Sequence, residues 1–198
     1  MNVPVDAKAL CIGGECGRVM AAILNPVDDS LTHVVVREPE PSLFSRLVPI
    51  QTVLSGDSES IRLGCTREEL GRMEVFSKTE FIPYDLSGTL FLQPYAVPLA
   101  AGIELEHEKI PAGELAVRRG FPVEARDGRI GTVDEFIVEP AGFRITHLVL
   151  RKGHLWDPRD VAIPVSRIDR ISERTVYLAA GKSEIEALPA VKVKRRWS

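Results

Sequence analysis

Three cysteines are the side chains with the most reactive chemistry in this sequence. Cys11 and Cys16 are separated by four residues, and Cys65 stands alone further along the chain. Because a cysteine reacts as its thiolate, a close pair of this kind suits redox work. Three is too few, and an odd number, for a disulfide framework, and no zinc spacing of paired Cys or His is present. We therefore expect inert, buried thiols in a reducing compartment.

A second group of candidate ligands is the acidic run around Glu104, Glu106, His107 and Glu108. On a strand the three glutamates would line one face and His107 the other, so we expect a solvated acidic edge rather than a metal site. HExxH, GxSxG, P-loop and GxGxxG patterns are absent, which removes the commonest hydrolase, kinase and dinucleotide-binding interpretations. The sequence thus predicts no enzyme, no catalytic residue, no cofactor and no metal ligand.

Composition points to a globular all-β protein. The 198 residues are 44% hydrophobic and 27% charged, while 15 Gly, 14 Pro and only 6% aromatics indicate many short turns. The net charge of −3 provides no general field for a polyanion. The basic tail at 192–197 is a local exception, which we interpret as a solvated end.

One long uncharged segment resembles a membrane span in length only. Residues 86–103 carry no charge, but Pro94, Pro98 and Gly88 would break the hydrogen bonds of a lipid-exposed helix. We read this segment as an extended linker. The N-terminus also lacks the pattern of a signal peptide, so we expect a cytoplasmic protein without membrane insertion.

An internal repeat organises the chain. The stretch GGECGRVMAAILNPVDDSLTHVVV at 13–36 aligns without a gap with DGRIGTVDEFIVEPAGFRITHLVL at 127–150, so that Gly17 meets Gly131. After one inserted residue in the second copy the alignment continues to the end of each copy. Both copies place residues that tolerate positive φ at a first turn and Pro at a second, which predicts successive hairpins.

The strands of each copy are apolar on both faces, which favours a closed small barrel. A short helical segment follows the strands, at 66–73 and at 183–188. We therefore predict two tandem barrels. They comprise 1–78 for the first barrel, 79–113 for a Pro-rich connector, and 114–198 for the second barrel with its basic tail.

The repeat also favours structural roles for cysteine and histidine. Each cysteine aligns with an apolar residue of the other copy, as a buried thiol does. These pairs are Cys11 with Ala125, Cys16 with Ile130 and Cys65 with Ala180. His33 aligns with His147, and each lies between β-branched or aliphatic neighbours, so we expect core histidines that can still titrate near neutral pH.

Two equivalent loops contain the residue types of protein interfaces. Aromatic and Arg side chains in loops are typical of interface hot spots. The candidate partner-binding residues are Phe44 and Arg46 in the first copy and His154, Trp156, Asp157 and Arg159 in the second. Alternatively, Phe44 and Trp156 cap the ends of their own barrels.

The ordered set DGxIGxV, an acidic-Pro turn, ITHLVL and IPVS resembles the PRC-barrel family. The resemblance covers 117–190 and, in a more divergent form, 3–75. The family includes the cytoplasmic part of the photosynthetic reaction-centre H subunit and the C-terminal part of a ribosome-maturation factor. The resemblance implies a barrel fold and a role as an interaction module, without catalytic residues.

The leading hypothesis is a non-enzymatic adaptor that binds another protein or a second copy of itself. One alternative is an RNA- or ribosome-associated factor that uses the basic tail at 192–197. Two others are an electron-transfer accessory like the H subunit, and a metal- or ligand-binding module that uses Glu104, Glu106, His107 or the His154 loop. The sequence alone names no pathway for the protein.

Overall fold

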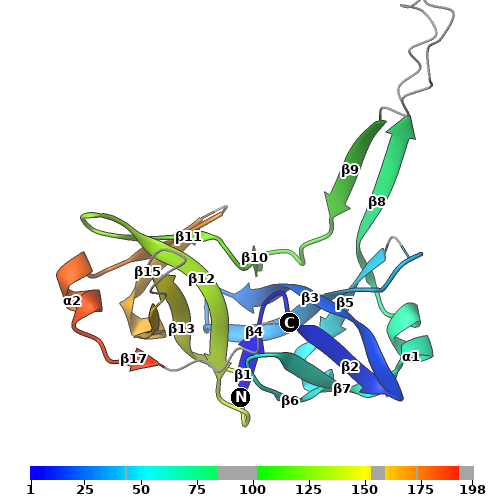
Figure 1. The fold of residues 1–198 in the computed structure, drawn as a ribbon, viewed down its shortest axis with the longest axis horizontal. Helices are drawn as coiled ribbons and strands as arrows, with labels where there is room; N and C mark the ends of the chain where they lie inside the picture. The colour runs from blue at the N-terminus through cyan, green and yellow to red at the C-terminus, as the bar shows by residue number, and fades with distance from the viewer. Residues whose placement is uncertain (43, 84–101, 153–158, 173, 192–198) are drawn as a thin grey trace, which may run out of the picture.

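The fold is all-β, as the sequence predicts, with two β-sheets and two short α-helices among the described residues (Figure 1). The computed structural model describes residues 1–42, 44–83, 102–152, 159–172 and 174–191. Of the predicted interface residues, His154, Trp156 and Asp157 lie outside the described part, as does the tail at 192–197.

The first sheet is formed mainly by the N-terminal half of the chain. Its strands follow the order β6-β7-β2-β3-β4-β5-β8-β9, and β10 pairs with β3 outside this order. The strands are β2 (Lys8–Ile12), β3 (Gly14–Asn25), β4 (Ser30–Arg37), β5 (Phe44–Pro49), β6 (Val53–Gly56), β7 (Ser60–Thr66), β8 (Val75–Pro83), β9 (Gly102–Glu108) and β10 (Leu115–Val117). A 3-10 turn (Ile50–Thr52) precedes β6, and helix α1 (Arg67–Arg72) follows β7.

The second sheet is formed mainly by the C-terminal half. Its order is β15-β16-β11-β12-β13-β14-β17, and β1 pairs with β12 outside this order. The strands are β1 (Asn2–Pro4), β11 (Pro122–Ala125), β12 (Gly128–Val138), β13 (Ile145–Lys152), β14 (Arg159–Pro164), β15 (Ile168–Ser172), β16 (Thr175–Leu178) and β17 (Ala190–Val191). A 3-10 turn (Val165–Arg167) precedes β15, and helix α2 (Lys182–Glu186) follows β16.

Strand pairings in the two sheets correspond at a numerical offset of 114, which becomes 115 after the one inserted residue of the second copy. Ala9 pairs with Gly17 between β2 and β3, and Val123 pairs with Gly131 between β11 and β12, each residue 114 positions later. The same bulge follows in both hairpins. Parallel pairing is also shared, since β2 pairs with β7 as β11 pairs with β16. The predicted hairpin turns before β3 and β12 are therefore confirmed.

Gly17 and Gly131 each permit a close approach of two neighbouring strands. An added Cβ would stand 2.2 Å from the Arg37 carbonyl oxygen at Gly17, and 2.5 Å from the Arg151 carbonyl oxygen at Gly131. Real Cβ atoms do not approach a backbone this closely, so only glycine fits without a shift of the strands. The two glycines thus perform the same task in the two sheets.

Each half of the chain contributes a short strand to the sheet of the other half. Strand β1 pairs antiparallel with β12, with Val3 opposite Phe136, and β10 pairs antiparallel with β3, with Val117 opposite Ala22. These registers also differ by 114 residues. The exchange is reciprocal, so neither sheet is complete without the other half.

A pair of backbone hydrogen bonds joins the two halves directly. The Leu31 N–H donates to the Phe143 carbonyl oxygen at 2.9 Å, and the Ile145 N–H donates to the Asp29 carbonyl oxygen at 2.8 Å. Each bond is the numerical counterpart of the other at the offset of 114. The halves are therefore related by an approximate two-fold axis that passes between these two bonds.

The core is continuous across both halves. One cluster of buried side chains includes Val3, Val34 and Leu63 together with Phe136, Leu148 and Ile163. A smaller cluster lies on the other face of the first sheet and is centred on Phe76. Because burial of apolar surface is the main favourable term in folding, the two halves stabilise each other.

The prediction of closed barrels is wrong for the pairing that the described residues show. Neither strand order returns from its last strand to its first. One sheet ends at β15 and β17 and the other at β6 and β9, and no strand pairing among the described residues joins these ends. Strands β11 and β1 share one edge of β12, so pairing along that edge continues into the other half. Strand β1 also approaches β6, where a Cβ on Gly56 would stand 2.1 Å from the Asn2 carbonyl oxygen.

A two-stranded ribbon projects from the first sheet (Figure 1). It is formed by β8 and β9, which pair antiparallel from Ser77 opposite Glu108 to Pro83 opposite Gly102. Part of the expected connector is therefore a regular hairpin arm. The side chains of Glu104, Glu106 and His107 lie outside the described part, so the acidic edge stays a prediction.

Helix α1 begins with a reciprocal capping box. The Glu69 N–H donates to the Thr66 hydroxyl at 3.2 Å, and the Thr66 N–H donates to the Glu69 carboxylate at 2.8 Å. This backbone bond, followed by the bond from the Thr66 hydroxyl, lowers the pKa of Glu69 below its ordinary value of 4.5. The charged carboxylate is thus favoured in the folded state.

We expect Thr66→Ala to lower the free energy of unfolding by about 1 kcal/mol, the usual cost of a lost N-cap. Glu69→Ala should also destabilise at neutral pH. Since the folded pKa of Glu69 is lowered, its contribution is present above pH 4.5 and is lost as the pH falls through the folded pKa. Urea unfolding at pH 7 and pH 3 measures both effects, and a Glu69→Ala deficit that persists at pH 3 would contradict the assignment.

Candidate interaction surface

The first half of strand β5 carries the two predicted interface residues of the first unit, Phe44 and Arg46. Arg46 forms an ion pair with Glu38, donates to the Met73 carbonyl oxygen at 3.2 Å, and lies 5.0 Å from the centroid of the Phe44 ring. Both Phe44 and Arg46 are half-buried. The guanidinium is therefore engaged within the chain, where it joins this strand to the end of α1.

The equivalent strand of the second half belongs to the other sheet. Arg159 begins β14 and pairs with Lys152 at the end of β13, while the side chain of Arg159 lies outside the described part. Of the predicted interface residues, the structure thus describes the side chains of Phe44 and Arg46 alone. Their role in binding is not tested by these contacts.

An apolar surface on the outer face of the first sheet was not anticipated from the sequence. Ile12 is 63% exposed and Leu54 is 70% exposed, and the half-buried Leu10 lies on the same face of β2 as Ile12. The Leu54 side chain lies over Gly64, whose added Cβ would stand 3.2 Å from a Leu54 methyl carbon. We call Leu10, Ile12, Leu54 and Gly64 the outer apolar face.

The matching positions of the second half are charged. They are Glu124 for Leu10, Arg126 for Ile12 and Asp169 for Leu54, with Arg126 and Asp169 exposed. The equivalent strands of the second sheet thus carry charged residues where the first sheet carries apolar ones, so the fold does not require apolar residues at these positions. The alignment of the two copies already contained this difference, because it pairs the same positions.

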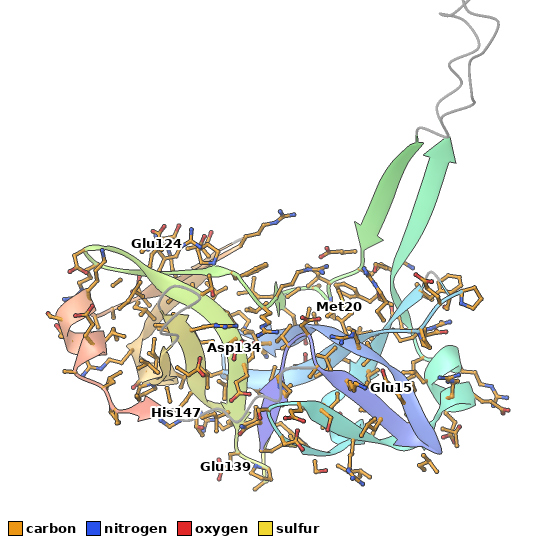
Figure 2. The ribbon with its side chains drawn as sticks, viewed as in Figure 1. Glu15, Met20, Glu124, Asp134, Glu139 and His147 are labelled. Carbon is orange, nitrogen blue, oxygen red and sulfur yellow. A yellow bond between two sulfur atoms is a disulfide. The ribbon has the colours of Figure 1, made fainter. Side chains whose placement is uncertain are left out.

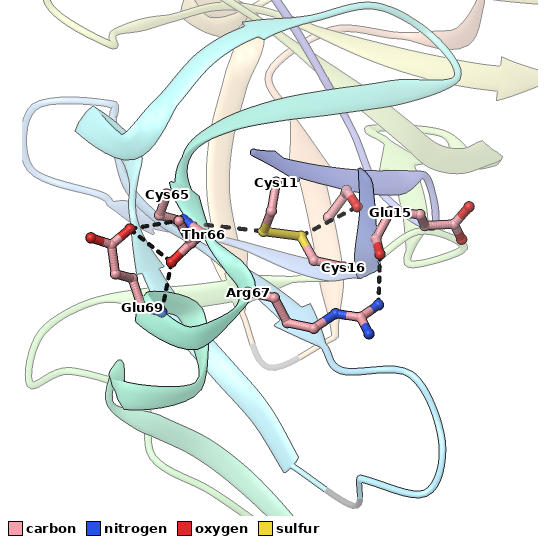
Figure 3. Close-up of a disulfide and its surroundings, with 8 residues drawn as sticks. Cys11, Glu15, Cys16, Cys65, Thr66, Arg67 and Glu69 are labelled. Carbon is pink, nitrogen blue, oxygen red and sulfur yellow. Dashed lines mark hydrogen bonds between the residues drawn. A yellow bond between two sulfur atoms is a disulfide. The ribbon is translucent and has the colours of Figure 1, made fainter. Parts of the chain in front are cut away.

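The three cysteines lie together, and the prediction of three inert free thiols is wrong. Cys11 and Cys16 form a disulfide with a Cα–Cα distance of 5.6 Å, while Cys65 is free (Figure 3). The bulge after Ala9 supplies the physical reason, since it leaves Cys16 unpaired across the hairpin and places it beside Cys11. All three cysteines are buried, as expected.

The histidines are half-buried at the sheet surface, not in the core. The Nδ1 atom of His33 lies 3.0 Å from the Thr32 hydroxyl, and that of His147 lies 3.1 Å from the Thr146 hydroxyl. Each histidine precedes a fully buried residue on its strand, so alternation turns the ring outward. His33 also lies 3.8 Å from Glu114, which accepts a hydrogen bond from the Thr32 hydroxyl.

A polar cavity of about 420 Å³ lies where β1 meets β12. Arg119 donates to Asp134 at 2.8 Å and to Asp6 at 3.4 Å, and Arg18 donates to Asp6 at 3.2 Å. Asp134 is buried, whereas the equivalent position of the first half is Met20 (Figure 2). Arg119 of the second half thus joins Asp6 of the first half to Asp134, which makes a structural link between the two halves.

The described residues contain no metal-binding cluster and no membrane-spanning helix. In this part of the chain no group of three or more His, Cys, Asp and Glu side chains is arranged to hold an ion. None of the helices there has the length and apolar character needed to cross a bilayer.

Comparison with known proteins identifies one domain. Residues 119–185 match the PRC-barrel domain, which places that domain in the second half, from the approach to β11 into α2. The match covers about a third of the chain, and no second copy was detected. No curated protein matches the sequence.

Proposed function

We propose that the PRC-barrel domain at residues 119–185 is one of two PRC-type units in this chain, and that the protein is a non-enzymatic cytoplasmic module that binds another protein. The first unit spans 1–78, the connector 79–113 and the second unit 114–198. Shared strand registers support the first unit, because residues on β2 to β7 pair as their counterparts do on β11 to β16.

The outer apolar face carries the proposal of protein binding. Exposed Ile12 and Leu54 lie on one sheet face, where the exposed Arg62 pairs with Leu10, whereas the PRC-matched unit has Arg126 and Asp169 at the positions of Ile12 and Leu54. A partner that covers this face removes apolar surface from water, which favours association. The complementary partner surface is apolar at its centre.

The start of β5 at Phe44 and Arg46 is proposed as a support of the first unit. Arg46 is engaged by Glu38, the Met73 carbonyl and the Phe44 ring, so using it to bind a partner would first break these contacts. This favours the capping interpretation of Phe44 over the interface interpretation. The loop of Trp156 keeps its proposed binding role.

The second unit supplies the substitutions for a test. Ile12→Arg and Leu54→Asp introduce the residue types that the second unit carries at the equivalent positions, Arg126 and Asp169. We therefore expect the fold to tolerate both substitutions. We expect the double variant to fold normally and to bind the partner at least about tenfold more weakly, since two apolar side chains of the proposed surface are replaced by charged ones. Affinity capture followed by titration with the purified partner measures the loss.

Val27→Asp is the matched control, because Val27 is 89% exposed in a turn outside the outer apolar face. This variant should bind the partner like the wild type. A double variant that retains full affinity would contradict the proposed face. Salt-sensitive capture of RNA that disappears when 192–197 is deleted would instead support the nucleic-acid alternative.

A further inference from the structure

The three buried sulfur atoms lie in an order that suits disulfide exchange. Cys65 Sγ lies 4.0 Å from Cys11 Sγ, which is bonded to Cys16. Figure 3 shows the sulfur of Cys11 between those of Cys65 and Cys16. A thiolate attacks a disulfide sulfur from the side opposite the leaving sulfur, and in the view of Figure 3 Cys65 approaches Cys11 from that side.

The sulfur that would leave, Cys16 Sγ, lies beside a hydrogen-bond acceptor. Cys16 Sγ lies 3.4 Å from the Ala9 carbonyl oxygen. In the disulfide this sulfur has no hydrogen to donate, but after cleavage the Cys16 thiol can donate to Ala9 without moving. The Ala9 carbonyl oxygen is thus placed to accept a hydrogen bond from the released thiol.

We propose that Cys11, Cys16 and Cys65 form a thiol–disulfide exchange site in which the bond moves between Cys11–Cys16 and Cys11–Cys65. Cys65 loses its proton and its thiolate attacks Cys11 Sγ. The Cys11–Cys65 bond forms while the Cys11–Cys16 bond breaks, and the electron pair leaves on Cys16, which takes up a proton. One disulfide and one thiol are present before and after the step, so it needs no oxidant or reductant.

Comparison of the two halves separates this role from simple packing. The equivalent positions of the second half hold Ala125, Ile130 and Ala180, all buried. The fold therefore fills this site without sulfur. The two disulfides also connect different strands, since Cys11–Cys16 closes the β2–β3 hairpin and Cys11–Cys65 would join β2 to its parallel neighbour β7.

The surroundings of Cys65 keep the exchange slow at neutral pH. Burial, followed by the nearby charge of Glu69, raises the pKa of the Cys65 thiol above its ordinary value of 9.0. The other charged groups beside the site are Arg67 on α1, which donates to the Glu15 carbonyl oxygen, and the Lys8–Glu15 ion pair of β2 and β3. Cys65 is thus stored as a thiol, and higher pH releases the thiolate.

The first experiment traps the second disulfide in full-length protein. Cys16→Ser and Cys16→Ala remove the leaving sulfur, and oxidised glutathione then accepts the two electrons of Cys11 and Cys65. Peptide mapping by mass spectrometry should find Cys11–Cys65 as the main product. Folded variants that carry only glutathione adducts or free thiols would overturn the proposal.

The second experiment uses the wild type, so it does not depend on the folding of a Cys16 variant. Oxidised protein is incubated with iodoacetamide at pH 7 and pH 9, and labelled cysteines are identified after acid quenching. Label should reach Cys16 about tenfold faster per pH unit, as the thiolate fraction of Cys65 rises. In Cys65→Ser, Cys16 should stay unlabelled.

Wild-type protein in which Cys16 is never labelled, or in which oxidation yields no Cys11–Cys16 bond, would overturn the proposal. Equal labelling of Cys16 in wild type and Cys65→Ser would also overturn it, because Cys65 would then play no part. These outcomes are independent of the proposed partner, since none of them involves binding.

Discussion

Gly131→Ala is expected to lower the free energy of unfolding by about 3 kcal/mol, because the added methyl group must displace backbone. Its Cβ would stand 2.5 Å from the Arg151 carbonyl oxygen and 2.7 Å from a Leu150 methyl carbon. Thermal unfolding should shift down by about 6 to 12 °C for a chain of this length. Gly17→Ala should cost as much, since its Cβ meets the Arg37 carbonyl oxygen at 2.2 Å.

Gly71→Ala provides the control for this prediction. Gly71 lies in α1, and an added Cβ meets no heavy atom within 4 Å. Alanine is favoured over glycine in a helix by about 1 kcal/mol, so this variant should be slightly more stable than the wild type. If Gly131→Ala melted with the wild type, the close approach of β12 and β13 would be refuted.

Phe136→Ala is expected to have the largest effect, about 3 to 5 kcal/mol, the usual cost of emptying a buried aromatic site. Phe136 is 1% exposed, pairs with Val3 of the exchanged strand β1, and belongs to the core cluster that spans both halves. Urea unfolding monitored by far-ultraviolet circular dichroism measures the loss.

Phe136→Leu is the matched variant for this site. Leucine keeps most of the buried volume, so its cost should be clearly smaller than that of alanine. Equal losses for the two variants would show that cavity volume does not govern stability at Phe136. Losses below about 1 kcal/mol for both would show that the residue is not part of the shared core.

Local turns and strand registers could be predicted from the sequence because their signals are local. Residue pairs that tolerate positive φ predict the turn at Gly13–Gly14 and the one at Asp127–Gly128, and the structure places hairpins there. The helical segments expected at 66–73 and 183–188 occur within about two residues of α1 and α2. These features depend on backbone preferences of neighbouring residues.

Contacts between distant segments could not be predicted in the same way. Strands β1 and β10 have three residues each, which is too short for a periodic pattern to reveal a partner. Their exchange between sheets, and strand orders that stay open where closed barrels were expected, therefore had no signal in the sequence. The Cys11–Cys16 disulfide was missed because alignment with Ala125 and Ile130 reports burial but not which side chains touch.

The candidate surface was predictable in part. Phe44 and Arg46 were selected by residue type, but type alone does not show that Glu38 and the Met73 carbonyl already engage the guanidinium. The outer apolar face was visible in the alignment as a difference between Leu54 and Asp169. Recognising it required knowing that both positions are exposed on equivalent strands.

The most direct test of the account asks whether the two halves fold as one unit. Hydrogen exchange of Phe136→Ala, resolved by peptide mass spectrometry, compares β12 and β13 with β3 and β4 of the other half. A shared core predicts that the slowest amides of both halves exchange faster by the same factor, between about 150-fold and 4,000-fold for 3 to 5 kcal/mol. Faster exchange confined to β12 and β13, with β3 and β4 unchanged, would contradict the account.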